Sequence, residues 1–401
     1  MVSRDCLDWP FFDDGHLELA HAFKQWATDS LPPLLEGAEE DADAVYLCVR
    51  RLVGELGKAG LLRSCVPAAY GGTREVLDTR SLCLARETLG YHSGLADFAF
   101  ATQGLGSAPI SLFGSEEQKR SILPGIAAGT RIGAFALSEP DAGSDVAAIS
   151  TRARQDGDGW RLNGVKTWIS NAGLADYYVV FAQEGNGSGS RGLSAFIVPA
   201  NTAGLDDGER IDVIAPHPLG TLRLTDCWIP AENRIGFGGD GFRIAMSTLD
   251  IFRSTVGATA LGLARRAMDE AVGRSLERRM FGQVLADFQM TRCKLGDMAV
   301  SIDAAALLVY RAAWTKDVRG TRVTREASTA KLFATEAAQQ VIDAAVQLFG
   351  GLGVVHGMPV EKLYREIRAL RIYEGASEVL KLIIGSKVIE DQRSADRCAA
   401  P

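Results

Sequence analysis

The spacing of apolar residues changes twice along this 401-residue chain, and that change limits the possible folds more than any other feature. Residues 1–130 are mostly typical of helices, residues 131–236 of short strands and turns, and residues 237–401 of helices again. One helical stripe in the first part contains Val45, Leu47, Val49, Leu52, Val53 and Leu56. Helices on either side of a β-segment do not fit an alternating βαβ sheet.

The pattern therefore predicts an α+β fold with three domains. We expect an N-terminal α-helical domain at residues 1–130, a middle β-barrel-like domain at 131–236, and a C-terminal antiparallel four-helix bundle at 237–401. The bundle helices are expected near residues 241–278, 284–316, 324–349 and 359–390, with a break in the last. One face of the third bundle helix would carry Phe333, Ala337, Val341, Ala344 and Leu348.

Two turn signals are expected to organise the β-segment. Asp156-Gly157-Asp158-Gly159 and Asn163-Gly164 both favour the tight turns of β-hairpins. Short strand candidates lie at residues 151–154, 159–162 and 177–182. Gly351-Leu352-Gly353 with Gly357 follows a helical pattern, so it predicts a helix–helix turn and not a dinucleotide-binding loop.

Composition argues against several classes of function. Apolar residues make up 47% of the chain, but no apolar run reaches the roughly 18 residues of a membrane-spanning helix. A net charge of −7 without a basic block argues against a nucleic-acid partner. Seven scattered cysteines and five unpaired histidines predict reduced thiols, a cytoplasmic location and no metal site. The first 16 residues include acids and predict neither a signal nor a transit peptide. Difficult chemistry would then need simple side-chain catalysis or an organic cofactor.

Five segments carry a more specific signal. They are ALSEPDAGSD at 136–145, KTWISN at 166–171, RRMFG at 278–282, QLFGG at 347–351 and IYEG at 372–375. In this order and spacing the chain resembles the acyl-CoA dehydrogenase family of flavoproteins, from about residue 45 to 390. The resemblance implies FAD as cofactor, an acyl-CoA thioester as substrate, and a homotetramer in which neighbouring subunits share each FAD site.

The resemblance also implies which residues contact FAD. Leu137 and Ser138 would bind the pyrimidine side of the flavin ring, Trp168 would form a wall beside it, and Ser170 would lie near flavin N5. Gly143 would let the backbone approach, and Ser144 would face the phosphopantetheine or pyrophosphate end of the thioester. Further cofactor contacts would come from Phe135, Ile169, Arg278, Phe281, Gln289, Gln347, Leu348, Gly350, Gly351, Ala376 and Glu378. Alternatives remain for two of these residues: Trp168 could be a core aromatic, and Arg278 a solvated helix-end residue.

Glu374 is the candidate catalytic base. A helical stripe stops near Tyr373, Gly375 breaks the chain, and Ser377 can cap a following helix at 378–389. A carboxylate at such a junction can point into a pocket. In the family, the matching glutamate removes the α-proton of the thioester while the β-hydrogen leaves as hydride to flavin N5, giving a trans-2-enoyl-CoA. The backbone N–H of Glu374 would help to stabilise the enolate charge. The alternative is a surface glutamate in a linker.

The remaining substrate residues are also implied by the resemblance. Asp250 and Arg253 match residues that contact the pantetheine, although their spacing equally suits an i,i+3 ion pair. Tyr373 and Gly375 would lie beside the thioester. Some relatives carry the base at the position of Phe252, which cannot take a proton, and Ala376 stands where threonine is usual.

The expected reaction is acyl-CoA dehydrogenation, with an electron-transferring flavoprotein as acceptor. An acyl-carrier-protein dehydrogenase, an acyl-CoA oxidase and a catalytically silent acyl-thioester-binding protein are the alternatives. Peroxide formation, the form of the thioester and the uptake of FAD would discriminate among them.

Overall fold

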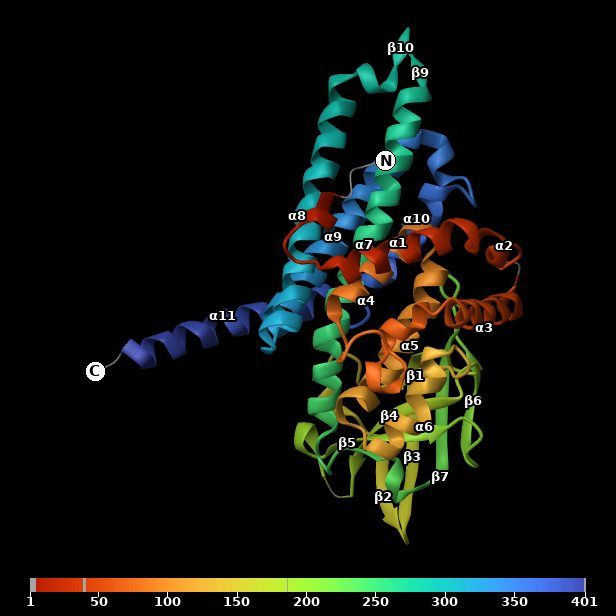
Figure 1. The fold of residues 1–401 in the computed structure, drawn as a ribbon, viewed down its shortest axis with the longest axis vertical. Helices are drawn as coiled ribbons and strands as arrows, with labels where there is room; N and C mark the ends of the chain where they lie inside the picture. Colours follow the sequence, from red (N-terminus) through yellow and green to blue (C-terminus); the bar gives the residue numbers. More distant parts are fainter. Residues whose placement is uncertain (1–4, 39–40, 186, 400–401) are drawn as a thin grey trace. The chain divides into compact units, whose positions relative to one another are not determined.

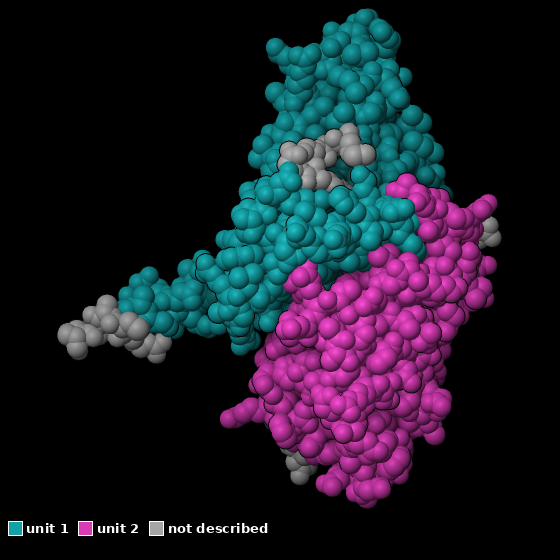
Figure 2. All heavy atoms as spheres, in the orientation of Figure 1, with its two compact units in different colours: residues 1–27, 79–94, 250–401 teal, residues 28–78, 95–249 magenta. Residues whose placement is uncertain are grey.

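The computed structural model describes residues 5–38, 41–185 and 187–399. Figure 1 shows its helices and strands, and Figure 2 colours two compact units. Unit 1 contains residues 1–27, 79–94 and 250–401, and unit 2 contains residues 28–78 and 95–249. Each unit is thus assembled from segments that are distant in the sequence.

Two of the four α-helices of unit 2 begin at capping side chains. Its helices are α2 (Leu31–Leu35), α3 (Ala42–Lys58), α5 (Gly94–Phe113) and α6 (Glu116–Ala127). Asp41 caps α3 by accepting a hydrogen bond from the N–H of Ala44, and Ser115 and Gln118 form a capping box before α6. The stripe expected on α3 is buried except at Leu47, which is 63% exposed.

Eight strands of unit 2 form one sheet. They are β1 (Gly133–Ala136), β2 (Arg152–Asp156), β3 (Gly159–Ser170), β4 (Tyr177–Glu184), β5 (Leu193–Pro199), β6 (Leu205–Arg210), β7 (Leu219–Pro230) and β8 (Arg234–Ile235). The strand order is β6-β7-β3-β2-β4-β5-β8, and β1 pairs with β4 in parallel. Among the described strands, β6 and β8 end the sheet without pairing to each other. The β-domain is therefore as expected, but the closed, barrel-like form is wrong because the sheet stays open.

Only one of the two expected hairpin turns forms. The turn after Asp156 joins β2 to β3, and Gly157 has φ 63°. Asn163 and Gly164 instead lie inside β3, so the second turn is wrong. β3 pairs with β2 on one side and β7 on the other, and the Gly164 region becomes an irregularity in the β3–β7 register. Because β3 is hydrogen-bonded to a strand on each side, Asn163 and Gly164 stay within the strand although their sequence favours a turn.

Unit 1 is mostly helical. It contains α1 (Asp14–Asp29) up to residue 27, α4 (Thr79–His92), α7 (Gly241–Glu277) from Asp250, α8 (Gln289–Arg319), α9 (Thr324–Phe349), α10 (Pro359–Leu370) and α11 (Ser377–Ala399). Short elements are η1 (Asp5–Asp8), β9 (Arg279–Met280), β10 (Gln283–Val284), η7 (Leu285–Asp287) and η8 (Gly350–Val354). The glycine-rich segment after α9 is thus a helix–helix connection, as predicted. No helix of the described ranges is long and apolar enough to cross a membrane.

Small residues let the helices of unit 1 pack closely. A Cβ atom at Gly257 of α7 would lie 2.9 Å from Val309 of α8 and 3.4 Å from the carbonyl oxygen of Ala330 of α9. α9 also contacts α8, α10 and α11. The face expected on α9 is displaced, since Phe333 is 38% exposed while Lys331 and Thr335 are fully buried. Alanines next to these polar residues create the buried face.

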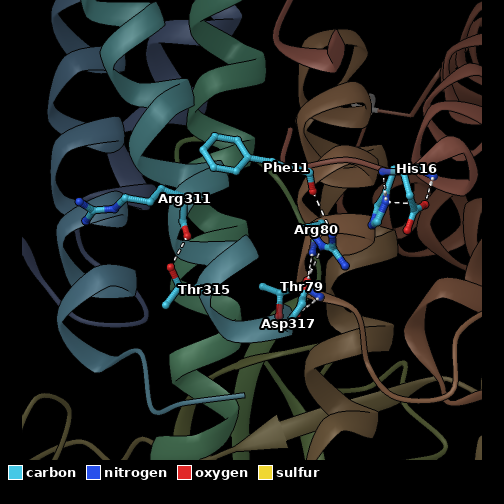
Figure 3. A network of polar contacts seen from close by, with 8 residues as sticks. Phe11, His16, Thr79, Arg80, Arg311, Thr315 and Asp317 are labelled. Carbon is cyan, nitrogen blue, oxygen red and sulfur yellow. Dashed lines mark hydrogen bonds and ion pairs between the residues drawn. The ribbon is translucent and has the colours of Figure 1, made fainter. Parts of the chain in front are cut away.

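Asp317 of α8 caps the first turn of α4 (Figure 3). Its carboxylate accepts hydrogen bonds from the N–H groups of Thr79 and Arg80, each 2.9 Å, and from Arg80 Nε at 3.1 Å. Arg80 also donates through Nη1 to the carbonyl oxygen of Phe11. A carboxylate is favourable at a helix N-terminus because the first N–H groups lack partners within the helix.

We expect Asp317→Asn to lower the free energy of unfolding by about 1.5–3 kcal/mol, because charge-assisted hydrogen bonds to a buried carboxylate are weakened. The Asp317 side chain is only 5% exposed, so water cannot replace these bonds easily. Urea unfolding at one fixed FAD concentration measures the effect. Asp297→Asn, at an exposed aspartate of the same helix, is the control. Equal unfolding curves for both variants would contradict this account of α4.

Candidate functional site

Glu374 lies in the turn between α10 and α11, in a left-handed backbone conformation. Its φ is 53°, and that of Gly375 is 105°. Glycine adopts such values without penalty, but for a residue with a side chain this conformation costs about 1–3 kcal/mol, which contacts with its surroundings must offset. Persistent strain of this kind is common at functional sites. The turn therefore needs contacts that fix it.

Two buried cations supply those contacts. Lys331 Nζ of α9 donates hydrogen bonds to the carbonyl oxygens of Tyr373 and Gly375, each at 2.6 Å. Arg253 Nε of α7 donates to the carbonyl oxygen of Glu374 at 3.3 Å. Three consecutive carbonyl groups thus accept hydrogen bonds from two cations on two different helices. This arrangement fixes the backbone from which the Glu374 side chain projects.

Acidic groups surround the cations. Asp250, one turn before Arg253 on α7, lies 3.5 Å from its guanidinium, and both residues are 4% exposed. The ion pair that the spacing allowed is therefore present. Asp250 also accepts a hydrogen bond from Thr324 Oγ1 at 2.7 Å and lies 3.6 Å from Arg322 Nε.

Phe252, where some relatives carry the base, is 1% exposed.

A second ion pair holds the start of α11. Glu336 of α9 accepts a hydrogen bond from Arg371 Nε at 2.9 Å and another from the hydroxyl of Ser377. The expected capping role of Ser377 is wrong, because α11 begins at Ser377 itself and the residue before the helix is Ala376. The Ser377 hydroxyl donates to Glu336. Burial raises the pKa of Glu336, but the hydrogen bonds from Arg371 and Ser377 outweigh burial and lower it below its usual range.

Burial and neighbouring negative charges shift the pKa values of Lys331 and Arg253 in opposite directions. Burial lowers the pKa of Lys331 to about 8, against the favourable charge of Glu374. Burial likewise lowers the pKa of Arg253, although Asp250 and Glu374 oppose the shift. Glu374 is therefore close enough to interact with both positive charges.

A different cluster in unit 2 fixes the segment that contains Leu137 and Ser138. Lys166 Nζ of β3 donates to the carbonyl oxygen of Leu137 at 3.1 Å and to Glu139 Oε1 at 2.8 Å. The N–H of Thr167 donates to the carbonyl oxygen of Ser138 at 3.0 Å. Leu137 is buried and Ser138 half-buried. The segment is thus attached to the edge of β3 through its backbone.

Glu139 is the centre of this cluster. Its carboxylate also accepts hydrogen bonds from the N–H and hydroxyl of Ser150, both at 2.7 Å, and from the N–H of Thr151 at 2.9 Å. Burial raises the pKa of Glu139, but Lys166 and these donors outweigh burial and lower the pKa to about 2. Glu139 therefore stays ionised and binds three separate parts of the chain together.

Trp168 stands out from the sheet. It has φ 59° and lies in the second irregularity of the β3–β7 register, between Lys166 and Ile169. Its side chain is 58% exposed, so the core-aromatic alternative is wrong. The neighbouring Ile169 is 1% exposed and Ser170 half-buried. Phe135 on β1 is half-buried, with its ring 4.9 Å from that of Phe181.

Two glycines leave open space that packing within the chain does not require. A Cβ atom at Gly143 or Gly351 would meet no heavy atom of the described chain within 4 Å, apart from its sequence neighbours. Neither glycine has a positive φ. Both are exposed, as is Ser144. Accessible backbone at these two positions is compatible with the close approach of a large cofactor such as FAD.

The remaining candidates lie on exposed parts of unit 1. α7 ends at Glu277, just before Arg278, and β9 and β10 form a hairpin whose turn residues are Phe281 (φ 51°) and Gly282 (φ 80°). Phe281 is 87% exposed. Arg278, Gln289, Gln347, Gly350 and Glu378 are also exposed, whereas Leu348 and Ala376 are half-buried. A large exposed aromatic in a left-handed turn is unfavourable for an isolated subunit.

Lys331 is the site residue that the sequence analysis missed. The sequence pattern that could have indicated it is a single lysine on an alanine-rich helix face. The alanines of that face, all buried, are Ala327, Ala330, Ala334 and Ala338. A lysine at such a position must find partners for its ammonium group. Lys166 and Glu139 were within the recognised segments, but their pairing depends on strands that meet only in the fold. The described residues contain no group of three or more His, Cys, Asp or Glu that could hold a metal ion.

Comparison with known protein families accounts for most of the chain. The N-terminal, middle and C-terminal domains of acyl-CoA dehydrogenases match residues 13–130, 134–227 and 239–389, respectively. The chain belongs to the acyl-CoA dehydrogenase family. The resemblance carried by the five segments is thus confirmed, and so is the expected enzyme class, an oxidoreductase.

Individual acyl-CoA dehydrogenases are similar along nearly the whole chain. The mitochondrial short-chain specific enzyme of Homo sapiens is 38% identical over 384 residues, which are 95% of this chain and 92% of the relative. Butyryl-CoA dehydrogenase from Megasphaera elsdenii has a TM-score of 0.88 and 35% identity, covering 94% of this chain and 99% of that one. An acyl-CoA dehydrogenase from Bacillus anthracis complexed with FAD has a TM-score of 0.86 and 31% identity. The match covers 96% of this chain and 68% of that one.

Proposed function

We propose that this chain catalyses the α,β-dehydrogenation of an acyl-CoA thioester to a trans-2-enoyl-CoA. The observation that carries the proposal is Glu374, whose strained turn is fixed by hydrogen bonds from Lys331 and Arg253. Relatives named for short acyl chains make butyryl-CoA the first substrate to test. A carboxylate that projects from a fixed backbone suits a base that must reach one particular carbon–hydrogen bond.

In the proposed mechanism, a carboxylate oxygen of Glu374 takes the proton from the α-carbon of the thioester. The backbone N–H of Glu374 is expected to donate to the thioester carbonyl oxygen, where negative charge develops. Asp250, Arg253, Tyr373 and Gly375 would line the thioester and hold the turn. FAD, when bound, supplies the acceptor for the β-hydride.

Unit 2 would supply one half of the FAD site. Its proposed contact residues either are accessible or are held in place through their backbone. Leu137 and Ser138 are attached to β3 through Lys166 and Thr167, and Trp168 projects from the bulge beside them. Gly143 leaves space for a close approach. The other proposed contacts in this unit are Phe135, Ser144, Ile169 and Ser170.

The other half of the FAD site is proposed to come from a second copy of the chain. Its contacts would be Arg278, Phe281, Gln289, Gln347, Leu348, Gly350, Gly351, Ala376 and Glu378. The exposed, strained Phe281 and the open space at Gly351 support this proposal. The assembly would be a homotetramer. In each chain, α7, α8, α9 and the broken fourth member, α10 with α11, would form an antiparallel four-helix bundle.

The domain bounds, the location and the electron acceptor complete the proposal. The domains would be residues 1–130, 131–236 and 237–401, which the three matching family domains support. The six cysteines whose side chains the structure describes form no disulfide with one another, in line with a cytoplasmic location. An electron-transferring flavoprotein would accept the electrons.

Arg278→Ala is expected to weaken FAD retention by about 10- to 100-fold, because a charge-assisted contact with the pyrophosphate is lost. The flavin released on dilution can be followed by its fluorescence. Arg279→Ala, at the exposed neighbouring residue, is the matched control. If both variants retained FAD like the wild type, Arg278 would not belong to the cofactor site.

The proposed reaction is tested by product mass. The FAD-loaded protein is incubated anaerobically with butyryl-CoA and an artificial electron acceptor, and the thioester product should be lighter by two hydrogens. Conversion of a carrier-protein thioester but not of any acyl-CoA would favour the carrier-linked alternative. Stoichiometric peroxide in air without another acceptor would favour an oxidase. A protein that takes up no FAD would leave only the silent binding protein.

A further inference from the structure

Lys331 is a buried ammonium group whose position in the fold is not explained by helix packing. It lies on α9 among small apolar residues, has no exposed surface, and spans from that helix to the turn between α10 and α11. An ammonium group in such a place loses hydration, so it is retained only where its hydrogen bonds and charge compensate. Its hydrogen bonds to backbone carbonyl groups end on the two residues that flank Glu374.

We propose that Lys331 is a positioning residue for Glu374, holding the left-handed turn through both flanking peptide groups and placing a positive charge beside the carboxylate. The inference rests on the proposed role of Glu374 as the base. Lys331 itself touches neither substrate nor cofactor in this account.

The geometric part follows from the turn. Tyr373 and Gly375 direct their carbonyl oxygens to one nitrogen atom, each at 2.6 Å, so that atom closes the turn around Glu374. Arg253 holds the carbonyl group between them. Without Lys331, two carbonyl groups lose a charged donor, and the strained φ of Glu374 can relax. A displacement of about 1 Å at a reacting group can lower a rate about 100-fold.

The electrostatic part follows from the charges that face this group. Glu374 and Glu336 interact favourably with Lys331, and Arg253 from α7 interacts unfavourably. Glu336 is itself paired with Arg371, so much of its charge is already compensated. Removing the Lys331 charge leaves Arg253 as the remaining buried cation beside Glu374 in this group. The ionised form of the base is then less favoured, and the acidic limb of kcat/KM should move to higher pH.

Two variants separate geometry from charge in the FAD-loaded enzyme. Lys331→Met has a similar length but neither donor nor charge, and Lys331→Gln keeps N–H donors without the charge. Thr335→Val is the control, because Thr335 is also fully buried on α9 and donates to the Lys331 carbonyl oxygen of its own helix. Amide hydrogen exchange of residues 371–377 reports the turn independently of activity.

For Lys331→Met we expect about tenfold faster exchange in this segment, about 100-fold lower kcat, and a KM within about threefold of the wild type. Lys331→Gln should protect the segment better and lose less activity, yet show the same shift of the acidic limb. Thr335→Val should resemble the wild type in exchange and pH profile. If Lys331→Met does not fold, the exchange and pH profile of Lys331→Gln still decide the question.

Wild-type exchange and kcat in the Lys331 variants would overturn the inference, as would an equal loss in Thr335→Val. Glu374→Gln, measured in parallel, tests the proposed function on its own. If Glu374→Gln kept full activity, Glu374 would not be the base, whereas faster exchange in Lys331→Met would still show that Lys331 holds the turn. The two failures are thus distinguishable.

Discussion

Glu374→Gln is expected to lower kcat by about 10³- to 10⁴-fold, because the amide cannot take the α-proton of the thioester. The substitution keeps the size of the side chain, and the hydrogen bonds of the turn end on backbone carbonyl groups, so the fold and the bound FAD should be retained. Steady-state assays with an artificial electron acceptor measure kcat, and the flavin absorbance confirms that FAD stays bound.

The control for this prediction is Glu390→Gln, at an exposed glutamate of α11, which should keep wild-type activity. A Glu374→Gln enzyme with kcat within tenfold of the wild type would mean that another group removes the proton.

Glu139→Ala is expected to lower the free energy of unfolding by about 3–5 kcal/mol, because the fully buried Lys166 is left without its counter-charge. Leu137 and Ser138 should also lose their fixed position, so FAD retention should fall with stability. Urea unfolding at a fixed FAD concentration and the flavin released on dilution measure the two effects. Glu232→Ala, at an exposed glutamate in unit 2, should change neither.

The pH dependence of stability offers a second check on Glu139. Its pKa is lowered to about 2 in the folded chain, so its ionised form stabilises the fold above its unfolded pKa near 4.5. That contribution, about 3 kcal/mol, is lost as the pH falls from near 4.5 toward 2. Wild-type stability should therefore decline more steeply over this range than that of Glu139→Ala. Parallel declines would mean that Glu139 is not the ionised centre of the cluster.

The sequence predicts the order of helices and strands and the candidate base because these depend on local patterns. The period of apolar residues marked the helices, and Gly375 after Glu374 marked the break between α10 and α11. The capping residue of a helix is harder to predict from sequence. Ser377 donates to a distant partner, Glu336, and does not cap α11. Local signals thus locate the turn but not the contacts that hold it.

Features set by distant partners could not be predicted. Asn163-Gly164 has the composition of a turn, but pairing with β2 and β7 keeps it within β3. The open sheet depends on which strands remain unpaired at its ends. On α9, Lys331 is buried and donates to the turn at Glu374, whereas Phe333 is 38% exposed. The periodicity of apolar residues alone predicts the opposite, a buried Phe333 and an exposed Lys331.

The central claim is tested most directly by anaerobic mixing of the FAD-loaded protein with butyryl-CoA and longer acyl-CoAs, for wild type and Glu374→Gln. The account predicts rapid bleaching of the wild-type flavin absorbance by at least one acyl-CoA, and bleaching slower by about 10³-fold or more in Glu374→Gln with FAD still bound. Equal bleaching of both proteins, or wild-type flavin that no acyl-CoA bleaches, would contradict it.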